Sequence, residues 1–548
     1  MKSQQFFFLF CLLSLFWACQ NPTPKANLII TNANIWTGND QQQYAQAMAI
    51  ASDTIMAIGN QEEIHSFKGS KTEIVDANGK FITPGFIDSH VHLLTGGRSL
   101  LSVDLRDAST PEEFSKRITD FAKSQPKGEW ILEGNWDHTL WGGELPRKEW
   151  VDDLTKDHPI ALYRLDGHMV FANSAALEFA GIDKNTPEVE GGIIVRDDAG
   201  NPTGILKSNA MNILLDKIPP MPAEQKTKSF KAAMDYFLSN GVTSVHDVDS
   251  TESYETARQF QANNELAVRV YSIKPIYKWQ QLANAKRVDT KWVKQGGVKG
   301  FVDGSLGSHT AAFHHAYSDQ ADDKGFFTFD PKDLYQWISK ADNANLHIMV
   351  HAIGDNAIHT LLNIFEQVIQ ENGKKDRRLR IEHAQHLATE DISRFADLSV
   401  IASMQPYHAI DDGRWAEEVI GPERIKSTYA FKSLLDANAM LAFGSDWAVA
   451  PASPLYGIYA AVTRRTLDDK NPNGWVQEQK ITVKQALQAY TKDAAYASFE
   501  EGIKGTLEVG KLADFVILSE DITAINPVKI REVEVVQTYV GGKKVYEK

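Results

Sequence analysis

The chain has 548 residues, of which 43% are hydrophobic and 23% charged, and its 71 acidic and 57 basic residues give a formal net charge of -14. This length exceeds one ordinary hydrophobic core, so we expect one large domain and a smaller accessory domain. The negative charge disfavours long-range attraction to a phosphate backbone, and no nucleic-acid partner is expected.

The first residues predict a targeting segment that is not part of the fold. Lys2 precedes an apolar run, residues 6–16, that is too short to span a bilayer as a helix. Residues 1–18 are therefore predicted to be a signal peptide, and residues 19–26 a polar tether. Cys19 stands where a bacterial lipoprotein carries its lipid; the alternative is a plain signal peptide with an incidental cysteine. We expect an exported protein, anchored by lipid to a bacterial membrane facing the periplasm or exterior, with no other membrane contact.

Cysteine usage limits the chemistry of the mature protein. Cys11 lies inside the apolar run, so no cysteine follows Cys19. Disulfides, thiolate nucleophiles and zinc–thiolate sites are thereby excluded from the mature protein. Any metal must be held by histidine, carboxylate or a rarer ligand.

Strand patterns near both ends of the chain predict a small composite β domain. Between residues 27 and 82, short apolar runs alternate with turn residues, as at 28–30, 47–50 and 54–59. The same pattern returns between residues 500 and 548, as at 513–518 and 533–540. Because chain termini often lie close together, we expect both segments to form one small β-sandwich.

Residues 83–499 alternate short apolar segments with helical patterns, which predicts βα units and a parallel sheet. The candidate strands are residues 85–92, 242–247, 267–273, 298–303, 347–353, 379–384, 400–406 and 440–446. Eight such units close a (β/α)8 TIM barrel, which places its chemistry at the C-terminal ends of the strands. About 150 residues separate the first two strands, so we expect a large insertion at about residues 100–235 that shapes access to the barrel mouth.

Metal-binding side chains fall at the predicted C-terminal ends of these strands. His90 and His92 are two residues apart, so both imidazoles project from the same face of their strand. His351 lies in the fifth strand, His383 near the end of the sixth, and Asp446 at the end of the eighth. Imidazole and carboxylate ligands suit zinc or another divalent transition metal. The sequence therefore predicts a metal site with these five ligands.

Longer motifs surround these residues. They are PGFIDSHVH at 84–92, VKGFVDGSLGS at 298–308, VHAIGDNAI at 350–358, RIEHA at 380–384 and GSDW at 444–447. In these motifs the chain resembles the amidohydrolase superfamily, and within it the amidohydrolase-3 branch that includes N-substituted formamide deformylases. The similarity runs from about residue 28 to the C-terminus, and it implies the barrel and the split β domain.

The resemblance adds a sixth metal ligand. Lys299 matches a lysine that many superfamily members carry as a carbamate bridging two metals. A protonated lysine is a poor ligand, whereas its carbamate is an anion with two ligand oxygens. The alternative is a structural barrel lysine paired with Asp303, which shares its strand face. Lys299 lies early in the predicted strand, away from the C-terminal end where barrels place their chemistry, whereas Asp303 lies at that end. One or two zinc ions are the expected cofactors.

The resemblance also implies metal-assisted hydrolysis of a C–N bond, other than a peptide bond, in a small amide, formamide or amidine. A metal-bound hydroxide would attack the carbonyl-type carbon. Asp446 would bind a metal, take the proton from the attacking water and pass it to the leaving nitrogen. His168 and Asp303 are the candidate substrate-binding residues; for His168, a loop histidine without such a role is the alternative.

Two other functions stay open. The same metal core supports deamination and the cleavage of esters or cyclic amides, because the fold and metal site do not determine the substrate. The second alternative is a lipoprotein that only binds a small molecule, which the six occupied ligand positions disfavour.

Overall fold

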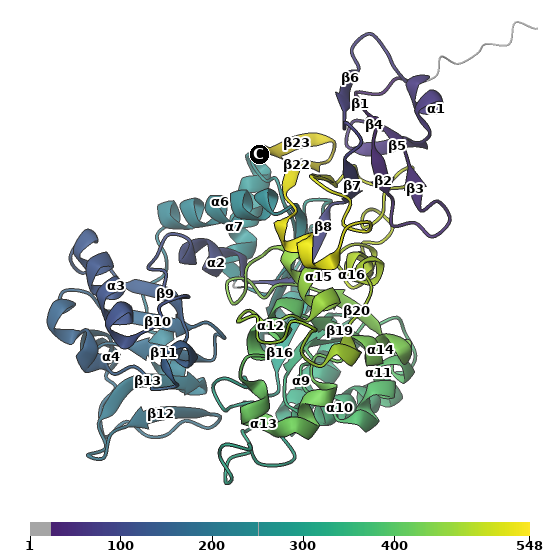
Figure 1. Cartoon of the computed structure of the whole chain (residues 1–548). Coiled ribbons are helices and arrows are strands. Elements are labelled where there is room, and N and C mark those ends of the chain that lie inside the picture. The colour runs from purple at the N-terminus through teal and green to yellow at the C-terminus, as the bar shows by residue number, and fades with distance from the viewer. Residues whose placement is uncertain (1–23, 250) are drawn as a thin grey trace, which may run out of the picture.

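The computed structural model describes residues 24–249 and 251–548. Figure 1 shows three parts: a central barrel, a blue lobe beside it, and a β region where the purple N-terminal strands lie next to yellow C-terminal ones. The predicted signal peptide, most of the tether and Cys19 lie outside the described residues.

An eight-stranded parallel sheet forms the barrel. In sheet order its strands are β8 (Phe86–Val91), β14 (Val242–Asp247), β15 (Arg269–Pro275), β16 (Val293–Phe301), β17 (His347–Ala352), β18 (Arg380–His383), β19 (Ile401–Met404) and β20 (Met440–Phe443). A bridge between Val91 and Trp447 joins β8 to the segment that follows β20, so the barrel is nearly closed. The number and order of the predicted barrel strands are confirmed.

The fourth barrel strand differs from its predicted extent. β16 begins at Val293 instead of residue 298, and it ends at Phe301. Lys299 therefore lies near the C-terminal end of its strand, on the chemical side of the barrel, and Asp303 lies in the loop beyond it. The early position that supported a structural role for Lys299 is wrong, because the strand already pairs with β15 from Val293 onward.

Helices cover the barrel. They are α2 (Leu93–Ser99), α6 (Ala223–Ser239), α7 (Thr251–Ala262), α8 (Trp279–Asn284), α9 (Pro331–Asn343), α10 (Asp355–Asn372), α11 (Ile392–Asp397), α12 (Pro406–Asp412), α13 (Ala416–Arg424), α14 (Phe431–Asp436), α15 (Pro454–Thr463), α16 (Val483–Ala489) and α17 (Lys492–Tyr496). In α10, Ile358, Leu361 and Phe365 recur at helical spacing and are buried in the main core. Gly373 ends that helix at a φ of 76°, a left-handed conformation that costs glycine little.

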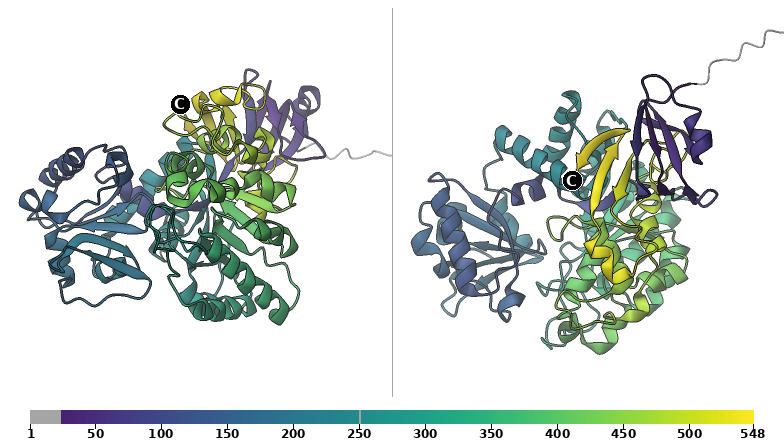
Figure 2. Two further views of the ribbon diagram at one scale, coloured as in Figure 1. Left: turned by 60° about the horizontal axis from the view of Figure 1, so that its bottom comes forward. Right: turned by 45° about the horizontal axis from the view of Figure 1, so that its top comes forward.

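The lobe is a five-stranded sheet inserted between β8 and β14. Its strands are β9 (Ile131–Trp136), β10 (Ile160–Arg164), β11 (Met169–Ala172), β12 (Gly192–Arg196) and β13 (Pro202–Ser208), with helices α3 (Pro111–Ser124) and α4 (Ser174–Ala180). Along β10, Leu162 packs with the cluster that contains α3, and Ala161 with the cluster that contains α4. Alternate side chains thus bury both faces of the sheet. Figure 2 shows the lobe to one side of the barrel from two further directions.

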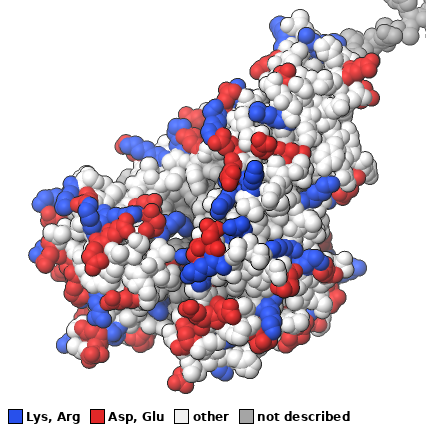
Figure 3. Space-filling view, viewed as in Figure 1, with Lys and Arg blue, Asp and Glu red and all other residues white. Residues whose placement is uncertain are grey.

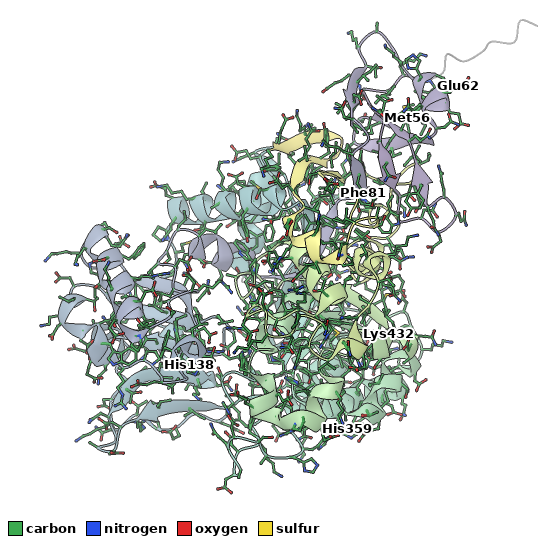
Figure 4. The ribbon with its side chains drawn as sticks, viewed as in Figure 1. Met56, Glu62, Phe81, His138, His359 and Lys432 are labelled. Atoms are coloured by element: carbon green, nitrogen blue, oxygen red, sulfur yellow. The ribbon has the colours of Figure 1, made fainter. Side chains whose placement is uncertain are left out.

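The β region combines both chain ends. One sheet contains β5 (Thr54–Gly59), β4 (Ala47–Ala51), β1 (Leu28–Thr31) and β6 (Glu73–Asp76); the other contains β23 (Lys543–Glu547), β22 (Val535–Val540), β21 (Phe515–Leu518), β7 (Phe81–Pro84), β2 (Asn34–Trp36) and β3 (Tyr44–Ala45). Phe81 of β7 pairs with Leu518 of β21, and Figure 4 shows it beside the C-terminal strands. One hydrophobic cluster, including Ile30 and Ile517, draws on both sheets. Arg269 of the barrel binds Asp514 through two hydrogen bonds of 2.6 and 2.8 Å.

The surface seen in Figure 3 carries interspersed acidic and basic side chains. Throughout residues 24–249 and 251–548, no helix is both long and apolar enough to cross a membrane.

Candidate metal centre and substrate cavity

Three predicted ligands meet at the C-terminal end of the barrel. One ligand atom from each of His90, His383 and Asp446 lies within 4.8 Å of the others, and all three side chains are buried. His90 lies in the first strand, His383 ends the sixth and Asp446 follows the eighth, and the ends of these strands converge because the sheet closes. Barrel closure therefore assembles the set, as expected for residues at strand C-termini.

The other three predicted ligands surround this group. His92 Nε2 lies 3.3 Å from Asp446 Oδ1, and Lys299 Nζ lies 3.3 Å from His90 Nε2. The His351 ring centroid is 4.5 Å from that of His383. His351 Nε2 donates to the carbonyl of Gly304 at 2.9 Å, which leaves Nδ1 as its ligand atom. Each of these three side chains thus lies next to a member of the group formed by His90, His383 and Asp446.

Asp446 carries the clearest sign that a cation belongs at this point. Its Oδ1 is buried and accepts no hydrogen bond from any described residue. The Nε2 atoms of His90 and His92 lie 3.5 and 3.3 Å away. A buried carboxylate oxygen without a donor is costly, and a metal ion held between it and the imidazoles satisfies it. The residues present fit a divalent metal.

Outer residues orient the imidazoles. Glu382 Oε2 is 2.5 Å from His90 Nδ1, so the Nε2 of that ring faces the centre. Arg380 and Ser403 each donate to Glu382 at 2.8 Å. Gln405 Oε1 is 2.9 Å from His383 Nδ1. Carboxylate and amide partners of this kind set the tautomer of metal-binding histidines.

Sequence reasoning assigned no role to Glu382, although it lies in the RIEHA motif. Adjacent side chains of a regular strand point to opposite faces, so Glu382 and His383 should diverge. The φ of His383 is 74°, and this left-handed residue at the strand end turns its imidazole back toward the centre. Asp446 has a φ of 57°. Such conformations cost roughly 1–3 kcal/mol each and are concentrated at functional sites.

The charges around the centre suit metal binding. Burial, followed by the nearby Lys299, lowers the pKa of His90 to about 4, which keeps the imidazole neutral. Burial also lowers the pKa of Lys299 to about 8, which makes its neutral, carbon-dioxide-reactive form accessible. Burial alone would raise the pKa of Glu382, but Arg380 and His90 hold it well below its usual value.

The lobe reaches the centre through His168. Its ring centroid is 4.9 Å from that of His351, and its backbone N–H donates to Asp166 at 3.1 Å. Asp166 also accepts hydrogen bonds from Ser305, Ser308 and Arg164 at 2.5, 2.9 and 2.7 Å. Ser305 and Ser308 belong to the barrel loop that follows β16. Asp166 therefore connects the lobe to the barrel, a role that the sequence alone did not reveal.

Asp303 has a different place from the one predicted. Its carboxylate is fully buried and accepts hydrogen bonds from the backbone N–H groups of Ala312, Ile353 and Gly354 at 2.8–3.0 Å. It lines neither of the two cavities at the metal centre. Asp303 thus holds the loops after β16 and β17, and the geometry supports neither substrate binding nor pairing with Lys299.

Two cavities meet at the metal centre. The larger, of about 460 Å³, opens between the lobe and the barrel and includes His90, His92 and Lys299. The smaller, of about 60 Å³, extends from His383 and Asp446 toward Arg414. Both include His168 and His351. His138, on the side of the lobe that faces the barrel, is 3.2 Å from Arg164, which lines both cavities (Figure 4).

Comparison with known proteins gives consistent similarities. Residues 73–546 match the model described as "Amidohydrolase family". The Arabidopsis thaliana protein LONG AFTER FAR-RED 3 is 38% identical over 564 residues, covering 98% of this chain and 95% of that protein. N-substituted formamide deformylase of Arthrobacter pascens is 28% identical over 550 residues, covering 96% and 99%. The crystal structure of an uncharacterized metal-dependent hydrolase from Pyrococcus horikoshii has a TM-score of 0.75 at 28% identity, covering 91% of this chain and 99% of that one.

Proposed function

This chain belongs to the amidohydrolase family and is a metal-dependent hydrolase, and we propose that it cleaves the C–N bond of a small amide or formamide. One observation carries the proposal: the buried, donor-free Asp446 Oδ1 among the imidazoles of His90, His92 and His383, beside a cavity of about 460 Å³. That arrangement needs a cation and leaves room for a small molecule next to it.

Six residues would hold the metal: His90, His92, Lys299, His351, His383 and Asp446. A divalent cation supplies two things to hydrolysis when bound: a water of lowered pKa and polarisation of the substrate oxygen. Histidine and carboxylate ligands favour zinc. We propose one or two zinc ions, with Lys299 as a carbamate that would supply anionic oxygen ligands, since burial lowers the pKa of Lys299 to about 8 and makes its neutral amine accessible.

The residues of the chain handle the proton. Burial would raise the pKa of Asp446, but the surrounding histidines keep it well below its usual value, so the carboxylate is ionised at neutral pH. The ionised carboxylate can accept a proton from water and return it to the leaving nitrogen. Glu382 and Gln405 hold His90 and His383 in place.

The role of Asp446 is tested by Asp446→Asn. Turnover should fall by roughly 10²–10⁴-fold, because the amide cannot take the proton, while zinc remains partly bound. The measurements are hydrolysis of a panel of formamides, acylated amines, cyclic amides and aminated bases, and zinc content by mass spectrometry. Wild-type turnover in the variant would show that Asp446 does not transfer the proton. Turnover of the aminated bases alone would reassign the enzyme as a deaminase.

The carbamate has its own test. Protein prepared with ¹³C-bicarbonate should show a carbamate carbon by NMR that is missing in Lys299→Ala. Short carboxylic acids should partly restore metal binding to that variant, because they can supply the oxygen ligands that the carbamate would provide. If the wild-type protein shows no carbamate carbon signal although its zinc content is full, the metal centre is held without a carbamate on Lys299.

A further inference from the structure

We infer that the cavity selects uncharged substrates with an apolar substituent and rejects amides that carry a carboxylate beside the scissile bond. This inference rests on the proposed function and narrows its substrate class. It follows from the walls of the two cavities that meet at the metal centre.

One wall of the larger cavity is apolar and is built from both sides of the opening. The residues are Met211, Leu215, Ile276, Tyr277, Phe301 and Phe329. Met211 and Leu215 come from the end of the lobe. Ile276 and Tyr277 follow β15, Phe301 ends β16, and Phe329 lies in the loop after β16. Figure 3 shows a recess where the lobe meets the barrel. An aromatic or branched alkyl substituent would bury its surface against such a wall.

The polar lining of the two cavities is acidic. Seven carboxyl groups line them: Glu133, Asp137, Asp166, Asp249, Asp411, Asp412 and Asp446. Three cationic side chains do so: Arg164, Lys299 and Arg414. If Lys299 becomes a carbamate, one of these cations is replaced by an anion. A bound divalent metal would offset part of this negative charge, but the reacting group of the substrate would occupy the metal.

None of the three cations is available to a substrate carboxylate. Arg164 binds Asp137 at 2.9 Å and Asp166 at 2.7 Å, and it is buried. Arg414 pairs with Asp411 and lies 3.8 Å from Asp137. Lys299 belongs to the metal centre, 3.3 Å from His90. Each guanidinium thus already has carboxylate partners.

A substrate carboxylate would therefore lose its hydration without gaining a cation. It would also approach like charges at close range in a partly enclosed space, where Coulomb repulsion is weakly screened. An uncharged substituent neither loses the hydration of a charge nor is repelled by the carboxylates. The difference applies to the bound substrate and to the transition state, so it should appear in kcat/KM.

Three matched compounds test this. N-(2-phenylethyl)formamide is uncharged, N-formylphenylalanine adds one carboxylate, and the methyl ester of N-formylphenylalanine restores neutrality at larger size. Hydrolysis adds the oxygen of water to the formyl carbon, breaks the C–N bond and protonates the amine, giving formate and the free amine. At pH 8.5, kcat/KM for the acid should be at least tenfold lower than for both neutral compounds. Equal values for the acid and its ester would overturn the inference.

A variant separates charge from shape. Tyr277 lines the cavity and is 56% exposed, so its replacement leaves the core intact. Tyr277→Arg should lower the ester-to-acid ratio of kcat/KM by at least threefold, and Tyr277→Gln, which is polar but uncharged, should not. The same drop in both variants would overturn the role of charge.

Binding distinguishes this inference from the proposed function. N-acetylphenylalanine and its methyl ester can be titrated calorimetrically into metal-free protein, where no hydrolysis occurs. If no formamide is hydrolysed but the ester binds at least tenfold more tightly than the acid, the proposed reaction fails and the selectivity stands. If the acid binds as well as the ester, or neither binds, the selectivity fails whatever the reaction.

Discussion

Glu382 determines which nitrogen of His90 faces the metal. Its carboxylate holds Nδ1, and Arg380 and Ser403 hold the carboxylate in turn. All four side chains are buried, so none of these groups can turn to water when a partner is lost. The orientation of one ligand thus depends on a chain of hydrogen bonds that starts on β18 and β19.

Glu382→Gln should lower zinc affinity by about 10–100-fold, because the neutral amide holds the imidazole less firmly and makes it less basic. Zinc affinity is measured by competition with a coloured chelator. Glu366→Gln is the matched control, since Glu366 pairs with Arg394 on the surface. Unchanged affinity in Glu382→Gln would show that the orientation of His90 does not depend on this carboxylate.

Asp412 predicts a pH dependence of stability. Burial raises its pKa to about 7 from an ordinary value of 3.8, although Tyr429 donates a hydrogen bond to it. The folded protein therefore binds the proton more tightly than the unfolded chain, and stability from this group falls as pH rises from about 4 to 7. Asp412→Asn removes that loss, so it should raise Tm relative to wild type more at pH 8 than at pH 5. An equal difference at both pH values would contradict this.

At the scale of elements, the lobe and the barrel meet through a small polar cluster. Asp166, at the turn after β10, accepts hydrogen bonds from two serines of the loop after β16 and from Arg164. Gly307 lies in the same loop, and a Cβ there would stand 2.5 Å from the Arg164 guanidinium. The loop can approach the lobe this closely because the residue is glycine.

Asp166→Ala should lower kcat/KM by about tenfold or more, because His168 loses its backbone anchor and the lobe loses its link to the barrel. Two measurements test this: the separate changes in kcat and KM, and the rate at which a protease cleaves the loop after β16. Faster cleavage would show that the loop is no longer held against the lobe. Asp183→Ala is the control, since Asp183 is exposed on the lobe and bonds within its own turn. Wild-type kinetics and proteolysis in Asp166→Ala would show that the lobe is held by other contacts.

At the scale of the whole molecule, we propose that the protein is exported and anchored by lipid on Cys19, as the apolar run before that cysteine predicts. Cys19→Ala should then move the protein from the membrane fraction to the soluble exported fraction. The measurement is fractionation with labelled palmitate. If the Cys19→Ala variant still incorporates palmitate, the lipid is attached to another residue. If the wild-type protein incorporates no palmitate and is found in the soluble fraction, residues 1–18 are a signal peptide without lipidation.

The sequence by itself determined the barrel, since the period of its apolar segments and their number specify eight βα units. It also located five candidate ligands, because His90, His92, His351, His383 and Asp446 fall at or near the ends of predicted strands, whereas Lys299 came from the resemblance to the amidohydrolase superfamily. Lys299 was misplaced within its strand, since burial on both faces of a parallel strand conceals where the strand begins.

Only the tertiary structure decided the surroundings of these residues. Glu382 reaches His90 across the barrel, Asp166 reaches a loop more than a hundred residues away, and Asp303 turned out to bind backbone N–H groups. Such contacts depend on barrel closure and on left-handed residues such as His383. Local sequence patterns carry the periodicity of an element, but they do not record which distant side chain completes its hydrogen bonds.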